Sequence, residues 1–275
     1  MVGRVRCVVL PLAAGRVGET TEMATSQLDG AIALVTGASS GIGAAAARRL
    51  AARGARLYVA GRDAGRLDAV ARAVGGTALT CDLAEPGASA ELGALVLEQA
   101  GRVDVLVNNA GQGWAGPLTG MTDTDITRLV TVNLAAPMSL TRAVLPGMLA
   151  RGRGHLGFVG SIAGRLGVRE EAVYSASKAG LTVFADSLRQ ETAHTAIVVT
   201  ELVPAVVDTE FFASRGRPYQ RTSPQPVPPG RAADALLTAM LNGHHEAYLP
   251  RWMYLPVAIR ATLPRLYRRL AARFG

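Results

Sequence analysis

Short apolar runs alternate with longer amphipathic stretches along most of the chain, and this alternation limits the fold more than any other feature. The apolar runs are expected to be strands, at 31–36, 55–60, 77–81, 103–109, 155–161, 196–203 and 246–249. The intervening stretches are expected to be helices, at 41–54, 63–74, 86–100, 122–150, 172–194 and 231–242. Almost continuously apolar runs are typical of strands buried on both faces. The pattern therefore predicts an α/β fold with a single doubly wound parallel sheet of about seven strands and helices on both faces.

The rest of the chain adds two terminal segments to one domain. We expect residues 1–27 to be a disordered leader, 28–250 the folded domain and 251–275 a basic amphipathic tail. A secretory signal is the alternative for the leader, but its apolar run is short and broken by Pro11, and Met23 begins a stretch typical of a natural start. The two cysteines do not suggest a disulfide framework or a metal site, which favours a cytoplasmic protein. The sequence contains no uninterrupted run of about 18 apolar residues, so no membrane-spanning helix is expected.

The sequence TGASSGIG (36–43) lies between the first predicted strand and the first predicted helix. Glycines there permit a tight turn and a close approach of the backbone to a ligand, and free N–H groups at the helix start can bind a pyrophosphate. A plain tight turn is the alternative, but the strand–loop–helix context favours a dinucleotide-binding Rossmann fold. The loop residues expected to contact the cofactor are Gly37, Ser39, Ser40, Gly41, Ile42 and Gly43.

The end of the second strand indicates which dinucleotide binds. An acidic residue there commonly holds the ribose of NAD, whereas an arginine accommodates the 2′-phosphate of NADP. Here Gly61 occupies the acidic position and Arg62 follows, which favours NADP over NAD. Two alternatives remain: Asp63 could be the ribose ligand if the register slips, and Arg62 could be a solvated charge. Further cofactor contacts are expected at the ends of the next two strands, from Asp82, Leu83, Asn109 and Gly111.

Of the 29 lysine and arginine residues, Lys178 alone is a lysine, and it ends the sequence YSASK. Tyr174 lies four residues earlier, so the two side chains share one face of a helix. An ammonium beside a phenol favours the phenolate, so we predict that Lys178 lowers the pKa of Tyr174 from its usual value of about 10. Such a tyrosine can exchange a proton with a carbonyl or an alcohol. Lysine, unlike arginine, can also release its own proton.

Five motifs together resemble those of the short-chain dehydrogenase/reductase (SDR) family of NAD(P)-dependent oxidoreductases. They are TGASSGIG, NNAG (108–111), VNL around Asn133, GSIAG around Ser161, and YSASK, in that family's order over about residues 28–250. The resemblance implies that Ser161 holds the substrate oxygen and that Tyr174 is the general acid in reduction and the base in oxidation. It implies that Lys178 binds the nicotinamide ribose, and that Asn133 holds a water on an irregular helix. It also implies a homodimer or homotetramer.

Two positions depart from the family pattern. Ala205 replaces the usual glycine after Pro204, so that turn is expected to be reshaped. Gly160 replaces a more common serine before Ser161. By the resemblance, Val207 and Thr209 would still approach the nicotinamide carboxamide. The proline-rich segment that follows is expected to cover the substrate, with Phe211 and Phe212 as apolar walls and Trp114 at another rim.

Positive charge is concentrated near the C-terminus. Residues 251–275 contain six arginines and no acid, interspersed with apolar residues. We expect the apolar side of this tail to pack on the domain or on a second subunit, and contact with the inner surface of an anionic membrane is the alternative. The chain shows no basic-aromatic pattern or docking motif of nucleic-acid readers, so no nucleic-acid partner is expected.

Three functions are compatible with these features. The favoured one is an NADP-dependent oxidoreductase acting on a lipophilic ketone or secondary alcohol. The second is a 3-oxoacyl-thioester reductase, whose arginines would contact an acidic carrier protein. The third is a non-catalytic dinucleotide-binding module, which the presence of Ser161, Tyr174 and Lys178 disfavours.

Overall fold

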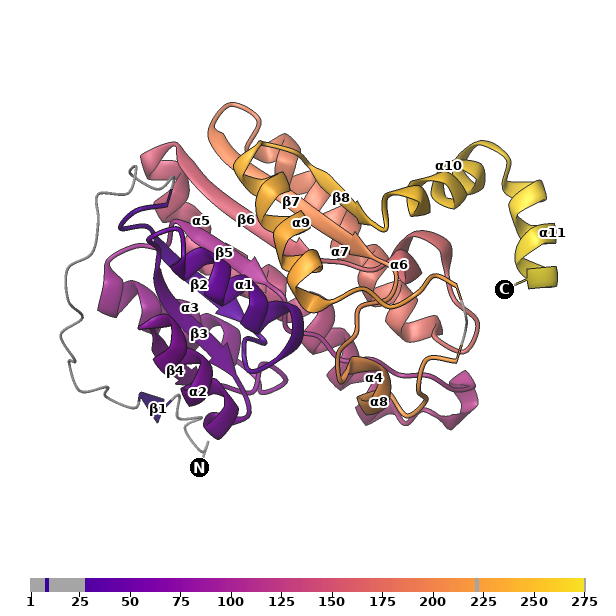
Figure 1. Cartoon of the computed structure of the whole chain (residues 1–275), viewed down its shortest axis with the longest axis horizontal. Helices are drawn as coiled ribbons and strands as arrows, with labels where there is room; N and C mark the ends of the chain where they lie inside the picture. Colours follow the sequence, from indigo (N-terminus) through magenta and orange to yellow (C-terminus); the bar gives the residue numbers. More distant parts are fainter. Residues whose placement is uncertain (1–7, 10–27, 221–222, 275) are drawn as a thin grey trace.

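Seven parallel strands form the centre of the protein (Figure 1). The computed structural model describes residues 8–9, 28–220 and 223–274. A short β1 (Val8–Val9) adds to one edge, antiparallel to β4. The predicted leader otherwise lies outside the described residues. The doubly wound parallel sheet is therefore confirmed, with parallel strands in the spatial order β4 (Thr77–Thr80), β3 (Arg56–Gly61), β2 (Ile32–Thr36), β5 (Val105–Asn108), β6 (Arg153–Val159), β7 (Ala196–Pro204) and β8 (Glu246–Leu249).

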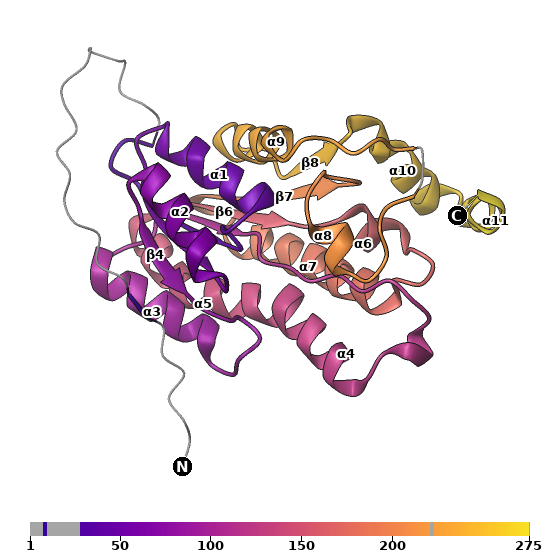
Figure 2. The same ribbon diagram turned by 60° about the horizontal axis from the view of Figure 1, so that its bottom comes forward.

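Helices cover both faces of the sheet (Figure 2). Alternate residues of each strand point into separate cores: Ala33 and Val35 pack with one helical layer, Ile32 and Leu34 with the other. This double burial explains why the strands are apolar throughout. The first layer contains α1 (Gly41–Ala51), α2 (Ala64–Val74) and α9 (Pro229–Leu241), and the second contains α3 (Ala88–Ala100), α5 (Ala136–Arg151) and α7 (Ala172–Glu191).

The strand order reverses beside β2, which pairs with β3 on one side and with β5 on the other. In this register Val35 lies opposite both Val59 and Val107, so the carboxyl ends of the three strands meet at one edge. The hydroxyl of Thr36 accepts the N–H groups of Asn109 and Ala110, each at 3.1 Å, and joins β2 to the turn after β5. Such a reversal opens a crevice in which ligands of α/β proteins bind.

The helix predicted over 122–150 consists of three parts. These are α4 (Asp123–Val130), a π-helical segment η2 (Thr131–Ala135) and α5. By length and composition alone, Asp123–Arg151 could cross a membrane, but 44% of its most apolar window is buried inside the protein. Its residues Leu140, Val144 and Met148 belong to the core beneath the sheet, so it is a core helix here.

Short helices surround the carboxyl edge of the sheet. They are η1 (Leu118–Gly120), α6 (Ile162–Leu166), α8 (Phe211–Ser214) and η3 (Arg251–Met253). The predicted tail forms α10 (Tyr254–Thr262) and α11 (Pro264–Phe274), which extend beyond the sheet on the side of α6 and β8 (Figure 1).

Candidate active site

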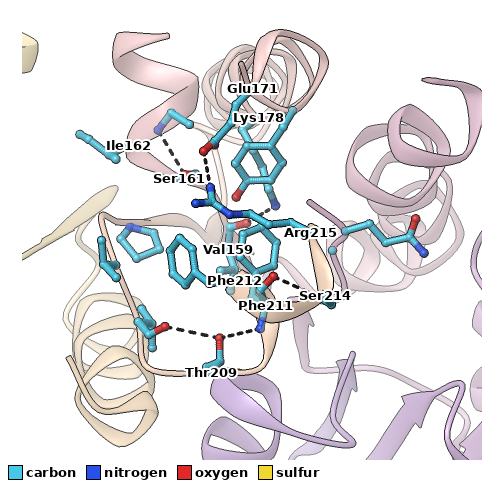
Figure 3. A pocket seen from close by; sticks show the side chains of 18 of the residues that line it. Val159, Ser161, Ile162, Glu171, Lys178, Thr209, Phe211, Phe212, Ser214 and Arg215 are labelled. Carbon is cyan, nitrogen blue, oxygen red and sulfur yellow. Dashed lines mark hydrogen bonds and ion pairs between the residues drawn. The ribbon is translucent and has the colours of Figure 1, made fainter. Parts of the chain in front are cut away.

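A cavity of about 1630 Å³ lies at the carboxyl ends of the strands. Its walls come from the loop before α1, the ends of β3, β5 and β6, the segment after β7, and the C-terminal helices. Figure 3 shows the part of this cavity that is lined by Ser161, Lys178 and Phe211. Because this is the edge where open parallel sheets bind ligands, the cavity is the candidate active site.

The glycine loop is held by Asn109. Gly37 and Gly41 have φ angles of 63° and 55°, which favour glycine. A β-carbon at Gly37 would also lie 2.8 Å from the backbone of Ala110. The amide of Asn109 donates to the carbonyl oxygens of Thr36 at 2.9 Å and Gly37 at 3.0 Å. Asn109 thus lines the cavity while its side chain fixes the loop.

The start of α1 fits a dinucleotide pyrophosphate. Ser40, the residue before the helix, makes no side-chain cap, and the first turn contains no acid, so N–H groups and a positive helix end face the cavity. The cavity-lining residues here are Gly37, Ser39, Ser40, Gly41 and Ile42. Gly43 does not line the cavity, and its contact with the cofactor stays a prediction. A β-carbon there would lie 2.4 Å from the carbonyl oxygen of Gly37, so Gly43 lets the helix pack on the loop.

The two candidate ligands after β3, Arg62 and Asp63, both line the cavity but differ in their contacts. Asp63 caps α2, since its Oδ1 accepts the N–H of Arg66 at 3.0 Å and its Oδ2 pairs with the Arg66 guanidinium at 2.6 Å. Arg62 lines the cavity beside Gly61. A β-carbon at Gly61 would lie 3.5 Å from the hydroxyl oxygen of Ser39, so these three residues surround one corner of the cavity.

Asp82 and Leu83, predicted to contact the cofactor, line the cavity after β4. Both oxygens of Asp82 are engaged, because Oδ1 accepts the N–H of Ala84 at 3.0 Å and Oδ2 pairs with Arg128 at 2.7 Å. Asp82 is therefore fixed in position by its neighbours.

Tyr174 and Ser161 meet in the same cavity at the other end of the cofactor cradle. Tyr174 lies on the first turn of α7, and Ser161 caps α6 by accepting the N–H of Ala163 at 3.1 Å. Burial raises the pKa of Tyr174 to about 12, and a hydrogen bond with Ser161 opposes that rise. The protein's own groups therefore keep the phenol protonated at neutral pH.

Lys178 occupies a buried position one turn after Tyr174. Its Nζ donates to the carbonyl oxygen of Val159, the last residue of β6, at 2.8 Å (Figure 3). Burial lowers the pKa of Lys178 to about 8. The prediction that Lys178 lowers the pKa of Tyr174 is thus wrong for the protein's own groups. Burial favours the neutral form of each group, so the pKa values of the phenol and the ammonium move in opposite directions.

Asn133 lies within the π-helical segment and is fully buried. Its side chain accepts the N–H of Gln112 at 2.8 Å and donates to the Gln112 carbonyl at 2.9 Å and to the Ser177 hydroxyl at 3.1 Å. A β-carbon at Gly111 would lie 3.4 Å from Asn133 Oδ1 and 3.6 Å from Lys178 Nζ. Asn133 therefore joins the cavity floor to the helix that contains Lys178, as a π-bulge at a functional site often does.

A buried carboxylate behind the site was missed in the sequence. Glu201, on β7, has no exposed surface, and it accepts from Thr182 at 2.9 Å and from Arg165 at 2.6 Å. Arg165 also pairs with Glu246 at 2.6 Å. Burial raises the pKa of Glu201, and the charge of Arg165 opposes that rise. The negative charge of Glu201 in turn opposes the fall in the pKa of Lys178. A lone acid in the apolar run of β7 was the available signal.

The segment after β7 covers the cavity with aromatic and charged side chains. The ring of Phe211 lies 5.5 Å from that of Tyr174, and Phe212 contacts Phe211 edge-on. Arg215 stacks 4.5 Å above the ring of Phe212 and pairs with Glu171 in a largely buried ion pair (Figure 3). Val207 and Thr209 line the approach from β7. Phe211 and Phe212 thus lie where the sequence predicts substrate walls.

Trp114, predicted at a rim of the substrate site, lies beside the cavity. It does not line the cavity but packs against the small cluster of Leu129, Ala163 and Tyr174. Its Nε1 is buried and has no hydrogen-bond partner among the described residues. Trp114 therefore belongs to the packing around the cluster that contains Tyr174.

The C-terminal helices close one side of the cavity. Met253, Pro256, Ile259, Tyr267, Leu270 and Ala271 all contribute to its lining. The Tyr267 hydroxyl donates to the carbonyl oxygen of Leu166 at 3.0 Å, and the Arg260 guanidinium donates to that of Arg165. Both acceptors belong to the last turn of α6, the helix that begins after Ser161.

Comparisons with known proteins agree with this geometry. The model of the short chain dehydrogenase family matches residues 31–220. Dehydrogenase/reductase SDR family member 7B of Bos taurus is 34% identical over 88% of this chain and 80% of its own length. The 3-oxoacyl-[acyl-carrier-protein] reductase FabG of Escherichia coli (strain K12) is 33% identical over 80% of this chain and 93% of its own length.

Two solved structures illustrate the fold with different cofactors. A short-chain dehydrogenase from Sphingobium yanoikuyae, in complex with NADPH, has a TM-score of 0.76 and 31% identity over 89% of this chain and 96% of that one. An SDR from Burkholderia phymatum, in complex with NAD, has a TM-score of 0.79 and 25% identity over 87% of this chain and 96% of that one. The family match and the identity to full-length relatives agree with the cavity geometry. The chain therefore belongs to the short-chain dehydrogenase/reductase family of oxidoreductases.

Proposed function

We propose that the protein transfers a hydride between NADP(H) and a ketone or secondary alcohol, with Tyr174 exchanging the proton. The observation that supports this most directly is that Ser161, Tyr174 and Lys178 line the same cavity as the glycine loop. A bound nicotinamide dinucleotide supplies or accepts the hydride, while the protein positions the substrate and moves the proton.

Each side chain has a distinct part in this proposal. The Ser161 hydroxyl orients the substrate oxygen beside Tyr174. The phenol of Tyr174, whose pKa of about 12 keeps it protonated at neutral pH, donates its proton to that oxygen during reduction. Lys178, with a pKa of about 8, can bind the cofactor ribose as a cation and also release a proton near neutral pH. Asn133 holds the irregular helix segment and the cavity floor in place beside it.

A preference for NADP rests on the corner formed by Ser39, Gly61 and Arg62. Asp63 is engaged as the cap of α2, so it is a poor ribose ligand. A guanidinium at Arg62 can bind a 2′-phosphate through paired hydrogen bonds. The NADPH-bound relative from Sphingobium yanoikuyae is compatible with this preference, although the NAD-bound relative shows that the fold itself accepts either cofactor.

The substrate side of the cavity favours a lipophilic molecule. Phe211, Phe212, Pro256, Ile259 and Leu270 line it. Arg215 is paired with Glu171, so its charge is neutralised locally. An apolar ketone fits such walls better than a sugar or an amine.

A 3-oxoacyl thioester is the second candidate substrate, supported by the similarity to the Escherichia coli 3-oxoacyl reductase and by the arginines of the tail. A turnover screen separates the two. The protein is assayed with NADPH and NADH against apolar ketones, free 3-oxoacyl thioesters and acyl-carrier thioesters. We expect NADPH-dependent reduction of apolar ketones that Tyr174→Phe lowers by about 10²–10⁴-fold. Turnover restricted to acyl-carrier thioesters would favour the second candidate, and undiminished turnover by Tyr174→Phe would contradict the mechanism.

A further inference from the structure

The C-terminal helices expose apolar side chains to an unusual degree. Of the nine large hydrophobic side chains exposed among the described residues, six lie in this segment. Leu255 is 62% exposed and Leu263 is 54% exposed, although the domain has ample core in which to bury such residues. Clustered exposed apolar surface of this kind indicates an interaction site. The six residues, here named the apolar tail surface, are Trp252, Tyr254, Leu255, Leu263, Leu266 and Leu270.

Basic side chains lie next to the apolar tail surface. Residues 251–275 contain no acid. Arg251, Arg265, Arg268 and Arg269 are exposed, and no salt bridge among the described residues involves them. On α11, Leu266 and Leu270 lie one turn apart on one side of the helix, and Leu263 directly precedes the helix. Leu270 lines the cavity at its edge, yet 41% of it stays exposed. Arg265, Arg268 and Arg269 lie on the opposite side of α11 from these leucines.

The helices are fixed by Met253 and Tyr267, while five residues of the apolar tail surface lie outside the cavity lining and Leu270 lies at its edge. Met253 is buried, and Tyr267 bonds to Leu166 at 3.0 Å while lining the cavity. Figure 2 shows α10 and α11 at one end of the molecule, away from the two layers that cover the sheet. The same segment therefore forms one wall of the active-site cavity and an exposed apolar, basic surface.

We propose that the apolar tail surface binds an anionic lipid bilayer, with its leucines and aromatic residues in the interface and its arginines among the headgroups. An amphipathic helix with a basic polar face binds membranes in this way. A second copy of the chain fits less well, because a symmetric contact would bring two acid-free, arginine-rich tails together. Membrane binding itself does not depend on the proposed reaction. A lipophilic substrate could then enter the cavity directly from the bilayer, and this consequence rests on the proposed function.

Flotation of the full-length protein tests the binding. Vesicles of phosphatidylcholine alone are compared with vesicles of phosphatidylcholine and phosphatidylglycerol in equal parts. We expect flotation with the anionic vesicles and strong weakening by high salt. Arg265→Gln, Arg268→Gln and Arg269→Gln together are expected to weaken binding by roughly a hundredfold. Leu263→Ser with Leu266→Ser should reduce it by at least about tenfold.

Matched controls use sites outside the tail. Arg72, Arg142 and Arg153 are exposed arginines of the domain, and their combined change to glutamine keeps the same net charge as the tail variant. Val183→Ser removes an apolar side chain that is 63% exposed on α7. Both controls should float like the unaltered protein. None of the substituted residues lines the cavity, so turnover of a water-soluble ketone should be unchanged in every variant.

Two results would overturn the proposal. One is failure of the unaltered protein to float with anionic vesicles, or equal flotation with neutral ones. The other is a dimer, measured by light scattering, that Leu263→Ser with Leu266→Ser dissociates, since the tail would then be a subunit interface. Flotation is read without any enzymatic assay, so a failure of the proposed reaction and a failure of membrane binding give different results.

Discussion

Gly160 and Glu201 are complementary in shape: a β-carbon at position 160 would lie 2.0 Å from Glu201 Oε1. The glycine that precedes Ser161 thus leaves room for the carboxylate that pairs with Arg165. The family more commonly has a serine at position 160. Here the smaller glycine makes room for a buried acid 41 positions later in the chain.

This fit predicts the effect of Gly160→Ser. The added side chain meets the carboxylate, so the free energy of unfolding should fall by about 1–3 kcal/mol. Gly120→Ser, where a β-carbon would have its nearest neighbour at 3.9 Å, is the matched control in denaturant unfolding. In a Glu201→Ala background the cost of Gly160→Ser should shrink, and equal costs in both backgrounds would refute the steric explanation.

Glu201→Gln should lower the pKa of Lys178 below its value of about 8, because the carboxylate opposes the effect of burial. Since Lys178 is the only lysine in the chain, lysine labelled with carbon-13 gives a single side-chain NMR signal whose titration reports this pKa directly. Glu246→Gln, which removes the more distant acid of the network, is the comparison and should shift the titration less. An unchanged Lys178 titration in Glu201→Gln would show that the two charges are not coupled.

Lys178 also makes stability depend on pH. Its folded pKa of about 8 lies below its ordinary value of 10.5, so the folded protein binds fewer protons than the unfolded chain between these values. The penalty from this residue is complete below about pH 8 and disappears as the pH rises towards 10.5. Lys178→Met should therefore flatten the rise of the unfolding free energy over this window. The same rise in both proteins would assign it to other groups.

Tyr174 should resist ionisation before cofactor is added. Burial raises its pKa to about 12, so ultraviolet titration should reveal no tyrosinate from this residue near pH 10. The difference between the unaltered protein and Tyr174→Phe isolates its contribution from those of the other tyrosines. A difference signal with a midpoint at or below 10 would contradict the effect of burial. In turnover, Tyr174→Phe should lower kcat by about 10²–10⁴-fold, the usual effect of losing a general acid.

Arg62→Ala should raise KM for NADPH by about ten- to a hundredfold, as expected for the loss of a charge-assisted hydrogen bond of about 1.5–3 kcal/mol. KM for NADH should change little, since NADH lacks the 2′-phosphate. Arg48→Ala on α1, which does not line the cavity, provides the control. An equal loss with both cofactors would place Arg62 away from the phosphate.

The fold was predictable because it depends on local patterns. Strands such as Ile32–Thr36 are apolar throughout since both of their faces are buried, and the helices between them keep a polar side. Residues of the glycine loop and of YSASK line one cavity, as their order along the chain suggests.

Contacts between distant segments were not predictable in the same way. Burial, which depends on the complete fold, reversed the expected direction of the Tyr174 pKa. Trp114 also depends on other segments, since it packs against the cluster of Leu129, Ala163 and Tyr174. Gly43 likewise packs close to the carbonyl oxygen of Gly37. Glu201 could have been suspected as the single acid in an apolar strand, but its partners Arg165 and Glu246 come from other parts of the chain.

The last turn of α6 has a practical consequence for experiments. Its carbonyl oxygens at Arg165 and Leu166 accept hydrogen bonds from Arg260 and Tyr267. A protein shortened at residue 250 would lose both donors, and the last carbonyl groups of the helix that starts after Ser161 would have to bond to water. Loss of activity on deleting the C-terminus could therefore come from damage to α6 and Ser161 as much as from loss of an external contact. Point substitutions on the exposed face of the C-terminal helices avoid this ambiguity.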